Sequence, residues 1–168
     1  MGIRFRVVRS HYRERRIKTD DPVGLAIRHA LGKAMKAVIP QSSRFILAAD
    51  TIVVLDKIIL GKPRTWKEAR QMLGMLSGRS HVVITAVILA DLVQKRMHAG
   101  YDITRVHFKR LLQPQILDYF RKVHPFDKAG GYAIQESPKI VRRIYGSYTN
   151  VMGLPKEILQ RMLKKADF

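Results

Sequence analysis

The chain has 168 residues, of which 46% are hydrophobic, so its size and composition favour one compact domain and exclude a disordered protein. It contains no cysteine, which excludes disulfide bonds and thiolate metal sites. Lysine and arginine number 32 against 13 aspartate and glutamate, and the net charge of +19 favours nucleotides, nucleic acids or anionic lipid as partners without choosing between them.

In chain order, the first two elements predicted are a strand and a helix. Apolar and basic residues alternate over Ile3 to Val8, which is the two-residue period of a strand. Asp20-Asp21-Pro22 then supplies a capping carboxylate and a first-turn proline, and predicts a helix over about 23–38. One face of this helix would carry Leu25, Ala26, His29, Ala30, Lys33, Ala34 and Ala37.

The middle of the chain predicts a hairpin and a second helix. Residues Phe45 to Leu55 are apolar and β-branched, as in a buried strand, and Asp56-Lys57 turns this strand into a short one over 58–60. The sequence Thr65-Trp66-Lys67-Glu68 is typical of a capping box, which begins a helix that Gly78 ends.

The second half continues the irregular alternation of strands and helices. Strands are expected over 81–92, 102–111 and 140–145, and helices over 114–123 and 154–163. This order indicates a single α/β domain over residues 1–168, with a mixed β-sheet and flanking helices. The start of the chain lacks the apolar stretch of a signal peptide, and no apolar run could span a bilayer. We therefore expect a cytoplasmic protein with no membrane partner.

The strongest chemical signal is Asp50-Thr51 within the first buried strand, followed by the turn Gly61-Lys62-Pro63. A carboxylate on a buried strand can hold a divalent metal or take a proton from water, and a lysine on a tight turn can meet a phosphate oxygen. The residues alone leave two alternatives open. Asp50 can cap a turn, and Lys62 can be one more solvated lysine in a basic chain.

Three further polar residues each allow two interpretations. Lys33 either extends to solvent or points into a cleft, and Glu14 is either a surface ion pair or an oxygen ligand for a metal. The amide of Gln135 can pair with the imide edge of uracil or thymine, or satisfy backbone groups. We interpret His81 and Thr85 as structural, and the six histidines lack the spacing of a zinc site.

Taken together and in order, these motifs resemble the Maf family of nucleotide pyrophosphatases. The stretches that carry the resemblance are Gly2-Ile3-Arg4-Phe5-Arg6-Val7-Val8 leading to Glu14, Leu31-Gly32-Lys33-Ala34, Ala49-Asp50-Thr51-Ile52-Val53-Val54, Leu60-Gly61-Lys62-Pro63, Leu76-Ser77-Gly78-Arg79-Ser80-His81-Val82-Val83-Ile84-Thr85, Asp127-Lys128-Ala129-Gly130-Gly131-Tyr132-Ala133-Ile134-Gln135 and Asn150-Val151-Met152-Gly153-Leu154-Pro155.

The resemblance implies an elongated α/β fold with a cleft between two lobes, and the hydrolysis of a nucleoside triphosphate to the monophosphate and pyrophosphate. It also implies a divalent metal, Mg²⁺ or Mn²⁺, and a homodimer. The Asp-Thr and Ile-Gln motifs are similar to those of the branch that acts on dTTP and UTP, with modified pyrimidine nucleotides as further substrates. By this resemblance Asp50 is the catalytic proton acceptor, Glu14 and Asp50 hold the metal, and the substrate-binding residues are Lys33, Thr51, Lys62 and Gln135.

The chain departs from the family most in its N-terminal part, since it contains no Ser-x-Ser-Pro-Arg-Arg segment, and to a smaller degree at His124-Pro125 and at Glu136. The resemblance places that segment ahead of Gly2 and gives it a role in gripping the triphosphate, so we expect a shortened N-terminus and slow turnover. One alternative is a catalytically impaired nucleotide-binding relative. A less favoured alternative is a basic nucleic-acid-binding protein, because aromatic residues are only 8% of the chain and fall mostly in apolar stripes.

Overall fold

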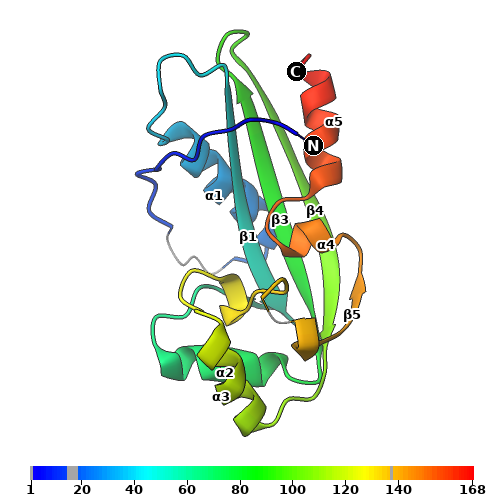
Figure 1. The fold of residues 1–168 in the computed structure, drawn as a ribbon. Coiled ribbons are helices and arrows are strands. Elements are labelled where there is room, and N and C mark those ends of the chain that lie inside the picture. The colour runs from blue at the N-terminus through cyan, green and yellow to red at the C-terminus, as the bar shows by residue number, and fades with distance from the viewer. Residues whose placement is uncertain (1, 15–18, 137) are drawn as a thin grey trace.

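The structure, a computed structural model, describes residues 2–14, 19–136 and 138–168. Its strands form one sheet in the order β2-β1-β3-β4-β5, and the molecule is elongated along the three long strands (Figure 1). The elements are α1 (Pro22–Met35), β1 (Phe45–Leu55), β2 (Ile58–Leu60), α2 (Trp66–Leu76), β3 (Ser80–Asp91), β4 (Arg96–Phe108), α3 (Gln113–Lys122), the 3₁₀ turns η1 (Ala129–Gly131) and η2 (Pro138–Ile140), β5 (Val141–Tyr145), α4 (Tyr148–Val151) and α5 (Lys156–Lys165).

The α/β class, the elongated sheet and the flanking helices are confirmed. In strand direction, the sheet is antiparallel at all four described pairs and does not mix parallel with antiparallel pairs. The central pairs are long: Phe45 to Val54 of β1 lie opposite β3, and all of β3 lies opposite β4. Short turns return β1 into β2 and β3 into β4, and such turns can join only antiparallel strands.

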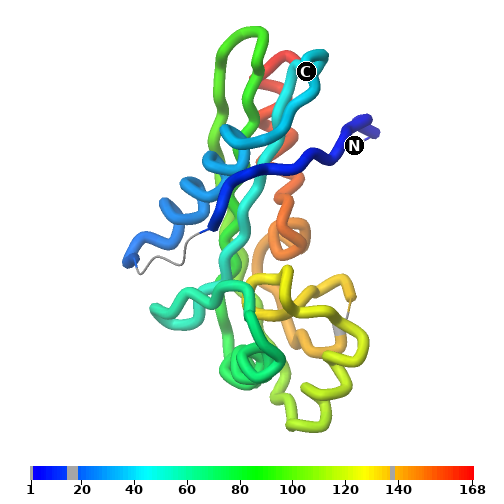
Figure 2. Tube along the Cα trace, turned by 90° about the vertical axis from the view of Figure 1, so that its left-hand side faces the viewer, coloured from blue at the N-terminus to red at the C-terminus, as the bar shows by residue number. Residues whose placement is uncertain are grey.

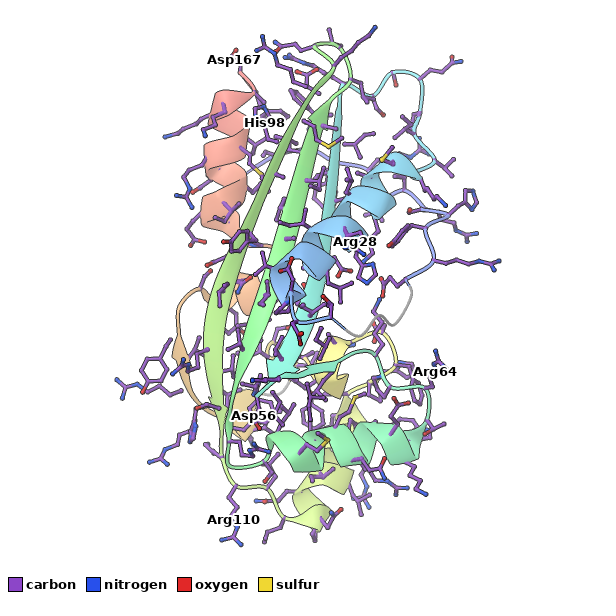
Figure 3. All side chains as sticks on the ribbon, turned by 180° about the vertical axis from the view of Figure 1, so that it is seen from behind. Arg28, Asp56, Arg64, His98, Arg110 and Asp167 are labelled. Carbon is purple, nitrogen blue, oxygen red and sulfur yellow. The ribbon has the colours of Figure 1, made fainter. Side chains whose placement is uncertain are left out.

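Two helices cover opposite faces of this sheet. The buried residues on the α1 face are Ala26, Ala30 and Ala34 of the helix and Ile52, Ile84, Ala86 and Ile88 of β1 and β3. Because successive side chains of a strand point to opposite faces, the alternate residues Val87 and Leu89 pack against Leu159 and Met162 of α5. Figure 1 and the reverse view in Figure 3, where Arg28 labels α1, show the two helices on either side of the strands.

Helices α2 and α3 build a second lobe at the other end of the strands (Figure 2). Its core joins the helices to β1, β3 and β4, and its buried side chains include Val53, Leu73, Leu76, Val83, Phe108, Ile116 and Tyr119. This core is separate from the cores beneath α1 and α5, so the fold has two lobes that share one sheet. Within the described residues, no helix combines the length and the apolar character needed to cross a membrane.

Local signals mark the starts of the first two helices correctly. The Gly24 amide donates to Asp21 Oδ1 at 2.8 Å, and the Glu68 amide donates to Thr65 Oγ1 at 3.1 Å. The capping box differs in its second half, since the Glu68 carboxylate accepts from the Arg64 amide at 2.7 Å.

Several expectations were wrong. Residues 3–8 form no strand, and Phe5 and Val7 are each 84% exposed, because the described chain offers no strand beside them to share backbone hydrogen bonds. Gln135 lies in a turn that follows the 3₁₀ turn η1. Helix α4 was missed altogether.

Candidate functional site

The candidate site begins at the point where β1 becomes an edge of the sheet. Strand β2 pairs only with residues 53–55 of β1, so in the described chain Asp50-Thr51 has a neighbour, β3, on one side alone. A cleft of about 900 Å³ opens there, lined by Glu14, Asp50, Thr51 and Lys62 among other residues. Since Asp50 and Thr51 are consecutive on a strand, they project toward opposite faces of the sheet.

On the α1 face, two carboxylates and two lysines converge. Lys33 Nζ lies 2.5 Å from Asp50 Oδ1 and 2.8 Å from Glu14 Oε1. Lys62 Nζ lies 2.9 Å from each carboxylate oxygen of Glu14. The cluster therefore joins the N-terminal loop, α1, β1 and the turn after β2. Asp50 is only 5% exposed, and it depends on Lys33 for its direct ion pair.

Burial and the neighbouring charges set the protonation of this cluster. Burial raises the pKa of Asp50, Lys33 lowers it in part, and Glu14 raises it further, so the net direction is upward. Burial also raises the pKa of Glu14, but the hydrogen bonds and charges of Lys33 and Lys62 outweigh it and hold this pKa at about 2. Burial lowers the pKa of Lys33, while Asp50 and Glu14 more than reverse this and keep the ammonium charged.

A short strap holds Glu14 in this position. Residues 9–11 run along the end of α1, where the His11 amide donates to Lys36 O at 2.9 Å and the Val38 amide donates to Arg9 O at 2.8 Å. The Tyr12 ring then lies on the helix at Gly32, where a β-carbon would come within about 2.2 Å of Tyr12 Cε2. Tyr12 Oη also bonds to His29 Nδ1 at 2.8 Å. Gly32 thus admits the ring that brings the loop, and Glu14 two residues later, against Lys33.

On the opposite face, the site continues into a hollow of about 230 Å³. Its lining includes Thr51, Lys128, Gln135 and Gly153, as well as Lys33, Asp50 and Lys62. Gly130, at a φ of 68°, lets the loop approach β1, and its amide donates to Gly61 O at 3.0 Å. This contact ties the loop that carries Gln135 to the turn that carries Lys62.

Thr51 belongs to a buried hydrogen-bond network on this face. Thr51 Oγ1 and Thr85 Oγ1 are 2.9 Å apart, and Thr85 Oγ1 donates to the backbone oxygen of Asn150 at 2.9 Å. The Asn150 side chain donates to Val83 O at 3.1 Å and to Thr104 Oγ1 at 2.9 Å. Sequence patterns did not reveal this network, because its members come from β1, β3, β4 and α4.

The structure thus brings all six residues predicted for the site to the two connected hollows. Sequence reasoning missed Tyr12, Thr85 and Gly153. Gly32, within the helix, was the one signal that pointed to Tyr12. Glycine in a helix interior costs stability and is kept where another group comes close.

The carboxylates of Glu14 and Asp50 are the oxygen donors that the site offers to a divalent cation. The described residues contain no group of three or more histidine, aspartate or glutamate side chains arranged to hold a metal. Glu14 and Asp50 nevertheless direct carboxylate oxygens at the same positive centre, Lys33 Nζ. Mg²⁺ is commonly bound by one or two carboxylates together with substrate phosphates and water, so two carboxylates suffice for a metal that arrives with its nucleotide.

Comparisons with known proteins point to a single family. The family model described as Maf-like protein matches residues 1–166. A dTTP/UTP pyrophosphatase of Citrifermentans bemidjiense is 44% identical over 155 residues, which cover 92% of this chain and 80% of that protein. The protein of the same name from Clostridioides difficile is 39% identical over 165 residues, covering 98% and 85%, and that from Treponema denticola is 36% identical over 181 residues, covering 100% and 89%.

Proposed function

The chain belongs to the Maf family, and on that premise we propose that it hydrolyses dTTP and UTP to the monophosphate and pyrophosphate. The observation that carries the proposal is the convergence of Glu14, Lys33, Asp50 and Lys62 in one cleft beside Thr51. The names of the relatives support the same activity.

The reaction begins with water attacking the α-phosphorus of the bound nucleotide. Asp50 accepts a proton from this water as its oxygen bonds to phosphorus, and the bond from the α-phosphorus to the bridging oxygen breaks. The electron pair of that bond leaves with pyrophosphate. Lys33 holds the Asp50 carboxylate in one orientation through its 2.5 Å contact.

The two lysines meet the charge of the triphosphate. Lys62 is 42% exposed at its side chain, so an entering phosphate can reach the ammonium that now bonds to Glu14. Lys33, fixed beside Asp50, stabilises negative charge that develops on the phosphoryl oxygens. Glu14 and Asp50 would hold Mg²⁺ or Mn²⁺, which supplies charge neutralisation on the phosphates.

Thr51 and Gln135 choose the base in the smaller hollow. The Gln135 amide offers both a donor and an acceptor to the polar edge of a pyrimidine, and the Thr51 hydroxyl lines the same hollow. A cytoplasmic location stays a prediction from the sequence, and the pairing of two copies stays a prediction of the family resemblance.

We expect kcat/KM for dTTP and UTP to exceed that for ATP and GTP by about tenfold or more, because a site built to hydrogen-bond one base leaves polar groups unpaired with another. The measurement is pyrophosphate release across the eight common nucleoside triphosphates, with Mg²⁺ or Mn²⁺. An Asp50→Asn preparation gives the background from contaminating enzymes. A preference for purine nucleotides, or release of orthophosphate in place of pyrophosphate, contradicts the proposal.

We expect Gly32→Ala to lower kcat/KM by about tenfold, since the new methyl group displaces Tyr12 and loosens Glu14. The same change should alter the unfolding free energy by about 1 kcal/mol or less, because the preference of alanine for a helix interior opposes the loss of the hydrogen bond between Tyr12 and His29. Gly74→Ala on α2 is the matched control, since a β-carbon there meets no atom within 4 Å. Unchanged kinetics in Gly32→Ala would show that the strap does not position Glu14.

A further inference from the structure

Beyond lining the hollow, Thr51 has a hydroxyl hydrogen whose direction its neighbours decide. Thr51 lies directly opposite Thr85 in the pairing of β1 with β3, with their oxygens 2.9 Å apart. A threonine hydroxyl has one hydrogen to donate and two lone pairs that accept. The direction of the bond therefore decides what Thr51 can offer a ligand.

Thr85 has already used its hydrogen. It is fully buried, and its Oγ1 donates to the backbone oxygen of Asn150, which also accepts from the Gly153 amide at 2.9 Å. A carbonyl oxygen can only accept, so the hydrogen between Thr85 and Asn150 belongs to Thr85. The hydrogen between the two threonines must then come from Thr51 in the arrangement that satisfies every buried group.

The lone pairs of Thr51 Oγ1, which a bond donated to Thr85 does not use, stay open to the hollow. Gly153 borders the same hollow at a φ of 94°, and a β-carbon there would lie about 3.2 Å from Thr51 Oγ1. A larger residue at this position would cover the oxygen. With Gly153 in place, Thr51 presents an acceptor and no donor.

We propose that Thr85 is a positioning residue that fixes Thr51 as a hydrogen-bond acceptor for the N3–H of uracil and thymine. This inference rests on the proposed function, and it adds a reason to reject cytosine. In cytosine N3 carries a lone pair. This nitrogen and the Thr51 oxygen would both be acceptors, so they could form no hydrogen bond. Thr51 could donate to that nitrogen only by leaving Thr85 without its donor, which costs a buried hydrogen bond.

The test is the ratio of kcat/KM for UTP to kcat/KM for CTP in the wild type and in Thr85→Val. Valine keeps the shape and removes the acceptor, so Thr51 becomes free to donate to N3 of cytosine. We expect the wild type to favour UTP and the ratio to fall by about tenfold in Thr85→Val. Thr85→Ser, which restores the hydroxyl, should return the ratio toward the wild-type value.

Thr104→Val is the matched control. Thr104 is as fully buried as Thr85 and bonds to Asn150 and Ser147, but not to Thr51. A variant that only perturbs the structure changes kcat/KM for UTP and for CTP together and leaves their ratio as it was. The inference is overturned if the wild type does not distinguish UTP from CTP, or if Thr85→Val and Thr104→Val change the ratio equally.

Binding of UMP and CMP by calorimetry separates this inference from the proposed function. Absence of pyrophosphate release from every nucleotide would refute the proposed enzyme activity. The ratio of the dissociation constants of UMP and CMP would still test the role of Thr85. Thr85→Ala, which also lacks the acceptor, replaces Thr85→Val if the valine variant does not fold, and the same loss of discrimination is expected.

Discussion

Replacing Asp50 with asparagine is expected to lower kcat by about 10²–10⁴-fold, the usual contribution of a positioned general base. The change keeps the size of the side chain and removes the carboxylate that would accept the proton. Lys33 retains Glu14 as an ion-pair partner at 2.8 Å, so the fold should survive. The measurement is single-turnover pyrophosphate release from UTP, with circular dichroism and the unfolding midpoint to confirm a folded protein.

The matched control for this variant is Asp91→Asn. Asp91 is also buried in a central strand and bonds to Arg44, with 3.1 Å between Asp91 Oδ2 and Arg44 Nη2, but it lies at the far end of β3. We expect Asp91→Asn to lower stability and to leave turnover near the parental rate. Turnover near the parental rate in a cleanly folded Asp50→Asn protein would refute the catalytic assignment.

Stability in acid should fall because of one buried histidine. His81 is 2% exposed, its Nε2 lies 2.7 Å from Tyr132 Oη, and it packs edge-on against Phe108. Burial lowers its pKa, with a further contribution from the charge of His107, from 6.5 to about 4. Below pH 6.5 the unfolded chain takes up a proton that the folded protein refuses, so the free energy of unfolding falls as the pH drops from 6.5 to 4.

The size of the effect follows from the shift in pKa. At about 1.4 kcal/mol for each pH unit, His81 should cost about 3 kcal/mol of stability between pH 7.5 and pH 4, and nothing more above pH 7.5. The test is urea unfolding at both pH values for the wild type and for His81→Gln, which can still bond to Tyr132 and does not titrate. Carboxylates contribute to both proteins and cancel in the comparison. An equal loss of stability in the two proteins would contradict the prediction.

Sequence patterns found the elements whose causes are local. The strand over Phe45 to Leu55 was predicted with its observed bounds. Both of its signals are local, since the apolar run lies within the strand and the turn at Asp56 follows it directly. The start of α1 followed from the cap at Asp21. The strand predicted over residues 3–8 failed because alternation describes one strand, whereas a sheet also needs a neighbour that sequence spacing does not reveal.

The site shows the same division. Asp50 and Lys62 were identified from short motifs, but their convergence on Glu14 depends on contacts between distant parts of the chain, with 48 residues separating Lys62 from Glu14. The interpretation of Thr85 as structural came from its place in a strand. Its hydrogen bond to the Asn150 backbone, 65 positions along the chain, is what makes Thr51 the donor in the hydrogen bond between the two threonines.

The alternation of side chains along β1 has a consequence for how this enzyme can change. Asp50 faces the lysine of α1, and the next residue faces the threonine of β3, so these two neighbours contact different elements. The two hollows nevertheless share Asp50, Thr51 and Lys62 in their linings. Thr85 of β3 bonds to Thr51 and to the Asn150 backbone, whereas Lys33 of α1 bonds to Asp50 and Glu14 and also lines the hollow that holds Thr51. Selection or design at Thr85 is therefore expected to alter nucleotide choice with less effect on bond cleavage than a change at Lys33, which is expected to alter both.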